Sequence, residues 1–159
     1  MPIIIDGHNL LWSIQNAGRD FESICEVRLC HILGRYLKLT GEKAQIVFDG
    51  AGPPDKRPFD NITDLEVIFS GRDADADNVI EDKIAASTAP RTLTVVSSDR
   101  RLRAAARARR APAVKAETFW VDLLERFSRT GKTTEPAAKR LGLSEGETEQ
   151  WLKVFGLGP

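Results

Sequence analysis

Ile3-Ile4-Ile5-Asp6-Gly7-His8-Asn9 lies at the start of the chain and decides its fold class. Three consecutive β-branched apolar residues are typical of a strand that is buried on both faces, as in a parallel sheet. The polar stretch that follows ends the strand, and residues 10–14 begin a short helix. Asp6 therefore stands where the first strand of the predicted sheet ends.

The same alternation of strand and helix continues along most of the chain. Apolar β-branched runs predict strands, and apolar positions with a helical period predict the helices between them. This order predicts an α/β fold with right-handed crossovers and a mainly parallel sheet covered on both sides. The predicted strands are residues 3–5, 44–48, 65–69, 92–96 and 113–115, and the predicted helices are residues 10–14, 20–41, 78–86, 100–108 and 118–127.

The boundaries of the domain follow from the same reading. We expect Asp20 to be the N-cap of the long second helix and Gly41 to be its C-terminal stop. Residues 49–65 show no clear helix, and residues 51–59 form a loop rich in Gly and Pro. The length indicates one domain of residues 1–130, followed by a small C-terminal helical extension of residues 131–159. We expect the apolar residues of that extension to dock on the domain, namely Trp151, Val154 and Phe155.

Composition and charge narrow the class of protein. The 23 basic residues balance the 23 acidic ones, so attraction to nucleic acid or to a membrane must come from a local patch. Cys25 and Cys30 would point to different faces of one helix, so we expect no disulfide and a reducing compartment. The start of the chain does not resemble a signal peptide, and no apolar run is long enough to span a bilayer. We therefore expect a cytoplasmic protein without a membrane partner.

Aspartates follow the predicted strands at matching positions. Asp6, Asp49 and Asp99 come after the first, second and fourth strands, and Asp77 begins the helix after the third. The carboxyl ends of parallel strands share one edge, so these side chains should converge there. Crowded carboxylates repel, and a hard cation with oxygen ligands relieves that repulsion. The sequence therefore predicts an Mg²⁺ or Mn²⁺ site held by Asp6, Asp77 and Asp99, of a kind that suits phosphodiester hydrolysis with one or two metal ions.

Each acid also has a plainer interpretation, because aspartate commonly turns the chain after a strand and caps helices. Asp99 is expected to cap the helix that follows it, and Asp49 is the weakest candidate for a direct ligand. The run Asp73-x-Asp75-x-Asp77 is similar to the start of an EF-hand loop. Asn78 and Ile84 replace the Gly and the Glu that such a loop requires, which excludes that type of calcium site.

Three other polar residues are candidates for a supporting role. Glu81 lies four residues after Asp77, so it either lines the site or forms a solvated pair on the same helix face. Asn9 either holds the Asp6 carboxylate or a phosphate, or simply caps a helix. Ser98 either donates a hydrogen bond to a carboxylate or is a turn hydroxyl. Neither His8 nor His31 has a triad-like context, so both are interpreted as structural or surface residues.

A basic stretch follows Asp99. The residues Arg100, Arg103, Arg107 and Arg110 are spaced to share one face of a helix that begins beside the acidic edge. In a chain of zero net charge, such a stripe indicates phosphate contacts, although it would also fit a solvated helix face. Lys56 and Arg57, in the loop after the second strand, are further candidates for RNA contact.

Five stretches together resemble the YacP-like branch of the NYN domain family, within the PIN-like nuclease superfamily. The resemblance implies a Rossmann-like, three-layer PIN/NYN fold and metal-dependent endoribonuclease activity, which some members exert on messenger RNA at the ribosome. It also implies that Asp6, Asp77 and Asp99 are catalytic, with Asn9 and Asp49 in support. The matching stretches are Ile4-Ile5-Asp6-Gly7-His8-Asn9, Val47-Phe48-Asp49, Glu66-Val67-Ile68-Phe69-Ser70, Ala76-Asp77-Asn78-Val79-Ile80-Glu81 and Ser98-Asp99.

Two other functions compete with this hypothesis. A non-catalytic RNA- or ribosome-binding module would share the fold, but it would not need a full set of acids that repel RNA. A phosphatase of the haloacid dehalogenase type also begins with a strand and an Asp, but it needs a second acid at the position of His8. We therefore expect a ribonuclease whose partners are RNA and, as a further candidate, the ribosome, and which is a monomer or a weak homodimer.

Overall fold

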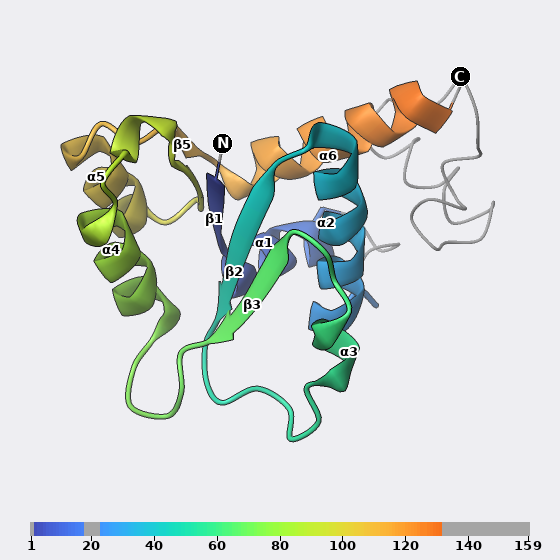
Figure 1. The fold of residues 1–159 in the computed structure, drawn as a ribbon, viewed down its shortest axis with the longest axis horizontal. Helices are drawn as coiled ribbons and strands as arrows, with labels where there is room; N and C mark the ends of the chain where they lie inside the picture. The colour runs from blue at the N-terminus through green and yellow to red at the C-terminus, as the bar shows by residue number, and fades with distance from the viewer. Residues whose placement is uncertain (1, 18–22, 132–159) are drawn as a thin grey trace.

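The computed structural model describes residues 2–17 and 23–131 of the chain (Figure 1). These residues form a parallel five-stranded sheet of order β3-β2-β1-β4-β5, with helices on both faces. The strands are β1 (Pro2–Asp6), β2 (Lys43–Phe48), β3 (Leu65–Phe69), β4 (Thr94–Val96) and β5 (Ala113–Val114). The helices are α1 (Gly7–Gln15), α2 (Glu26–Thr40), α3 (Arg57–Asp60), α4 (Ala76–Ala86), η2 (Pro90–Thr92), α5 (Arg100–Ala108) and α6 (Ala116–Gly131).

The central strand β1 is buried on both faces, as its β-branched run predicts. Ile3 and Ile5 are 4% and 0% exposed and belong to the core between the sheet and the helices α1, α2 and α6. Ile4 is 4% exposed and belongs to the second core, under α4 and α5. Figure 1 shows these two groups of helices on opposite sides of the sheet. The predicted α/β, three-layer architecture with a parallel sheet is therefore confirmed.

At the end of β1 the backbone of Gly7 passes close to Val47 and Phe48 of β2. A Cβ atom at position 7 would lie 2.5 Å from the ring of Phe48 and 2.9 Å from the carbonyl oxygen of Val47. Only glycine fits there, and α1 can therefore begin directly after Asp6, against the neighbouring strand β2. In the parallel register Asp6 pairs with Val47, so its side chain stands at the carboxyl edge of the sheet.

Several predicted boundaries were wrong. Helix α2 begins at Glu26, not after Asp20, because its N-cap Cys25 is extended, and the buried Ile24 before it accepts a hydrogen bond through its carbonyl from Gln15 Nε2 at 2.9 Å. Strand β4 begins at Thr94, since the preceding residues form η2. Helices α4 and α6 each begin two residues earlier than predicted.

Other expectations about the chain have mixed outcomes. The predicted helix stop at Gly41 is confirmed by its left-handed φ of 72°. The link after β2 holds only the four-residue helix α3. Both cysteines are free. No helix within the described ranges is long and apolar enough to cross a membrane. Asp20 itself lies outside the described residues. The same holds for the predicted docking of the C-terminal extension, of which only Gly131, at the end of α6, is described.

Candidate active site

Asp6 is the most deeply buried acid at the carboxyl edge of the sheet. Its side chain is held by Ser97, whose Oγ donates a hydrogen bond to Asp6 Oδ2 at 3.1 Å. Ser97 is fully buried, and its Oγ also accepts a hydrogen bond at 3.1 Å from the backbone N–H of Asp99. One serine hydroxyl therefore joins the ends of β1 and β4 and orients the carboxylate between them.

The pKa of Asp6 shows which charges surround it. The pKa is raised from 3.8 to about 6, mainly because burial disfavours the charged form. The carboxylates of Asp77 and Asp49 raise it further, whereas the hydrogen bonds from Ser97 and from the backbone of Asn9 lower it. The charges at the ends of β1 and β2 and at the start of α4 therefore interact, as expected for a shared edge.

Asp77 occupies the first turn of α4, which Asp75 caps by accepting a hydrogen bond from the backbone N–H of Asn78 at 2.7 Å. The pKa of Asp77 is raised by partial burial and by the negative charges of Asp99, Asp75 and Asp49, against the opposing effect of Arg101. Asp77 therefore interacts electrostatically with both of the other acids predicted to be catalytic.

Asp99 and Asp49 each accept hydrogen bonds from backbone N–H groups at the start of a helix. Asp99 Oδ1 caps α5, as expected, by accepting hydrogen bonds from the backbone N–H groups of Arg101 at 2.8 Å and Leu102 at 3.3 Å. Asp49 Oδ1 accepts a hydrogen bond at 2.7 Å from the backbone N–H of Ala76, the first residue of α4. Asp49 thus holds the start of the helix that carries Asp77, a positioning role that fits the prediction that it is the weakest candidate for a direct ligand.

His8 has more partners at this edge than the sequence indicates. Its Nδ1 lies 3.2 Å from the backbone nitrogen of Asp49 and 3.4 Å from the Asp49 carboxylate oxygen Oδ2. Nε2 lies 3.6 Å from a carboxylate oxygen of Glu26, and the ring packs edge-on against Phe48 with centroids 5.2 Å apart. These contacts anchor His8 between β2 and α2.

Asn9 and Ser98 are brought together, although not as predicted. Asn9 Oδ1 accepts a hydrogen bond at 2.8 Å from the backbone N–H of Ser98, so this side chain ties α1 to the loop after β4 instead of holding Asp6. Ser98 Oγ donates to a carboxylate, as one interpretation predicts, but the acceptor is Glu117 Oε2 at 2.6 Å. Its neighbour Ser97, which the sequence did not single out, contacts Asp6.

Glu81 is bound by Arg101, an arginine that the sequence pattern did not indicate. Arg101 Nη2 donates hydrogen bonds to Glu81 Oε2 at 2.9 Å and to Asn78 Oδ1 at 2.6 Å, and its Nε contacts the other Glu81 oxygen. Glu81 is therefore in an ion pair between α4 and α5. The signal available in the sequence is that Arg101 follows Asp99 by two residues on the helix that Asp99 caps.

The predicted arginine stripe holds only in part. Helix α5 ends at Ala108, and Arg110 lies beyond it with a left-handed φ of 59°, so Arg110 does not share the helical face. Arg100 and Arg107 are exposed, whereas Arg103 is half-buried and its Nε is buried without a hydrogen-bond partner among the described residues.

The two cations predicted in the loop after β2 have local partners. Arg57 donates to both carboxylate oxygens of Asp55, at 2.9 Å and 3.1 Å. Lys56 Nζ donates to the carbonyl oxygen of Pro53 at 3.2 Å and lies 5.5 Å from the centre of the Phe69 ring. Their proposed RNA contacts would therefore compete with these interactions.

The acids supply the oxygen ligands that Mg²⁺ or Mn²⁺ prefers, and their mutual repulsion fits a cation between them. Within residues 2–17 and 23–131, however, no three His, Cys, Asp or Glu side chains are close enough together to hold an ion. The chemistry of the donors thus fits a divalent cation, whereas the distances among the described side chains do not form a ready-made site.

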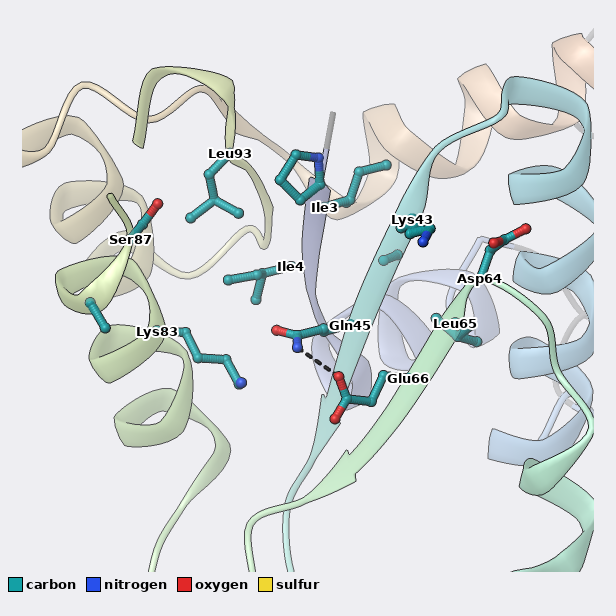
Figure 2. Close-up of a pocket in the computed structure, with 13 residues that line it drawn as sticks. Ile3, Ile4, Lys43, Gln45, Asp64, Leu65, Glu66, Lys83, Ser87 and Leu93 are labelled. Carbon is teal, nitrogen blue, oxygen red and sulfur yellow. Dashed lines mark hydrogen bonds between the residues drawn. The ribbon is translucent and has the colours of Figure 1, made fainter. Parts of the chain in front are cut away.

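A cavity lies at the other end of the sheet. It has a volume of about 670 Å³ and is lined by the first residues of β1, β2 and β3 and by the end of α4 (Figure 2). Gln45 Nε2 donates a hydrogen bond at 2.7 Å to Glu66 Oε2 across its wall (Figure 2). None of Asp6, Asp77 and Asp99 lines this cavity, so the acidic edge is separate from it.

Comparison with known proteins agrees with the fold. The family model described as the YacP-like NYN domain matches residues 3–153. The crystal structure of Rae1 (YacP) from Bacillus subtilis is 22% identical, with a TM-score of 0.61, and the match covers 98% of this chain and 92% of that one. Its W164L mutant is 20% identical, with a TM-score of 0.59 and coverage of 89% and 90%. The comparison with curated proteins gave no match.

Proposed function

The chain belongs to the YacP-like NYN domain family, a family of nucleases with a PIN-like fold, and from this premise we propose that it is a metal-dependent endoribonuclease. The observation that carries the proposal is the electrostatic interaction of Asp6, Asp77 and Asp99 at the carboxyl edge of the sheet. Acids with a purely structural role have no need to stand where their charges raise the pKa values of Asp6 and Asp77, and such perturbed groups are typical of functional sites.

Asp6, Asp77 and Asp99 are the residues that would hold Mg²⁺ or Mn²⁺. When bound, the cation would polarise the scissile phosphate and lower the pKa of a coordinated water. Ser97 fixes the orientation of Asp6, and Asp49 fixes the start of the helix that carries Asp77. Asp99 uses only Oδ1 for its cap, so among the described residues its Oδ2 is left without a hydrogen-bond partner and is available as a ligand.

The test of this function is cleavage of RNA. Labelled single-stranded and structured RNA is incubated with the protein in Mg²⁺, in Mn²⁺ or in EDTA, beside the Asp6→Asn variant. We expect internal cleavage that needs the metal and is lost in the variant. RNA binding without cleavage in any of these conditions would instead favour the non-catalytic binding module. The ribosome as a partner, the oligomeric state and the cytoplasmic location stay predictions.

Arg100 is the exposed cation nearest in sequence to the catalytic acids, at the first position of α5. We predict that Arg100→Glu weakens binding to single-stranded RNA and lowers the slope of log K against log salt by about 0.7, because one phosphate contact is lost. Equilibrium binding from low to high salt measures this slope. The control is Arg91→Glu, which makes the same charge change on η2, at the amino end of β4. Equal slopes for Arg100→Glu and the wild type would show that Arg100 is only a solvated residue on the face of its helix and contacts no phosphate.

A further inference from the structure

Trp12 is unusually exposed for a large aromatic residue. The described residues include two exposed large hydrophobic side chains, Trp12 at 63% and Leu39 at 41%. Trp12 lies on α1, three residues after Asn9 and therefore on the same helix face. Asn9 contacts the loop that carries Asp99, and Trp12 is six residues beyond Asp6, about 9 Å along a helix. An apolar ring surface is thus presented to solvent close to the acidic edge.

A small hollow lies beside this ring, between α1 and the start of α6. Its volume is about 230 Å³, and it is lined by Trp12, Ser13 and Asn16 on one side and by Glu117 and Trp120 on the other. Ser13 is only 8% exposed, and its Oγ has no hydrogen-bond partner among the described residues. A buried hydroxyl without a partner is costly, so the hollow is suited to a ligand that brings a polar group to Ser13.

We propose that this hollow, which we call the Trp12 pocket, binds one unstacked nucleobase of a single-stranded RNA substrate. The proposal rests on the proposed ribonuclease function and names the form of RNA that the site takes. An exposed indole offers the stacking surface that single-stranded nucleic acids use, and Ser13 and Asn16 offer hydrogen bonds to the edge of the base. The volume is below the roughly 300 Å³ at which sites for drug-sized ligands begin, which suits one ring system.

Glu117 connects the pocket to the acidic edge and gives it a preference among bases. Its Oε2 accepts a hydrogen bond from Ser98 Oγ at 2.6 Å, and the backbone N–H of Ser98 contacts Asn9. The hydrogen bond from Ser98 is the main reason that the pKa of Glu117 is lowered, so Glu117 is an ionised, acceptor-only group. A carboxylate accepts hydrogen bonds from the exocyclic amino groups of cytosine and adenine, which uracil lacks.

The test is equilibrium binding of RNA octamers to variants of Trp12 in the inactive Asp77→Asn background, with Mg²⁺ present. We expect Trp12→Ala to raise the Kd for an oligocytidine octamer by about 5- to 100-fold and Trp12→Phe to change it by less than about 5-fold, because stacking survives on a smaller ring. Leu39→Ala is the control for loss of exposed apolar surface and should leave the Kd unchanged. On an octamer of abasic ribose phosphates, Trp12→Ala should have no effect.

Two further outcomes separate the pocket from the function on which it rests. Equal Kd values for Trp12→Ala and its parent on oligocytidine would overturn the pocket and leave the ribonuclease proposal intact. If the parent protein bound no RNA at all, both proposals would fail. Oligocytidine should bind more tightly than oligouridine, and Glu117→Gln should reduce that preference. If Glu117→Gln left the preference unchanged, Glu117 would not determine which base the pocket prefers.

Discussion

The Asp77→Asn variant is expected to cleave RNA about 100-fold more slowly than the wild type, or not measurably. Asp77 stands in the first turn of α4 and interacts with the charges of Asp99 and Asp49, and its carboxylate is one of the three that we propose to hold the cation. An amide in its place removes one negative ligand. Since a bound cation contributes several kcal/mol to the transition state, and each 1.36 kcal/mol is tenfold in rate, a loss of roughly two orders of magnitude or more follows.

The same substitution should leave the fold intact. A negative charge in the first turn of a helix contributes about 0.3–1 kcal/mol, and the neutral amide of the variant would lose this contribution. The loss is offset because the raised pKa of Asp77 shows that burial and its acidic neighbours disfavour the ionised form. In EDTA, therefore, the melting temperature should stay within about 4 °C of the wild type. Single-turnover cleavage assays and thermal melts separate the two effects.

Asp82→Asn is the matched control, because Asp82 lies on the same helix and is exposed to solvent. This control should cleave RNA at the wild-type rate. Wild-type activity in Asp77→Asn would contradict the site, and loss of activity in both variants would show that the total charge of α4 matters and not the position of Asp77.

The fold could be predicted from sequence because its main determinants are local. The apolar run of β1 and the acids at the strand ends are readable without knowledge of tertiary contacts. The start of α2 was missed because Ile24 continues the helical apolar period, and only its burial before the extended N-cap Cys25, with its carbonyl bonded to Gln15, places it outside the helix. Tertiary packing here overrides the local pattern.

The polar partners of the site could not be predicted in the same way. Ser97 and Ser98 are adjacent, and the parallel register that pairs Ile5 with Val96 decides which of them faces Asp6. That register depends on long-range strand pairing. The contacts of Arg101 with Glu81 and of Ser98 with Glu117 likewise join elements that only the fold brings together.

Asp6→Asn is expected to stabilise the metal-free protein at neutral pH, although it removes activity. The folded-state pKa of Asp6 is about 6, against an ordinary value of 3.8, so the folded protein binds this proton more tightly than the unfolded chain. Between these two values the wild type therefore loses stability as pH rises, and above about pH 6 the loss is complete. Two pKa units correspond to about 3 kcal/mol, an order-of-magnitude value for a group that is 6% exposed.

Asparagine cannot ionise, keeps the shape of the side chain and offers an oxygen to the Ser97 hydroxyl. At pH 7.5 in EDTA, the variant should therefore melt about 5–10 °C above the wild type, and the difference should disappear near pH 4. Adding Mg²⁺ should raise the melting temperature of the wild type only, because a cation that binds the folded state stabilises it by mass action. An Asp6→Asn protein that is less stable than the wild type at pH 7.5, or a wild type that Mg²⁺ does not stabilise, would contradict this account. The expected pattern would mean that Asp6 is kept at a cost to the fold, and such a cost is intelligible only for a residue that the reaction needs.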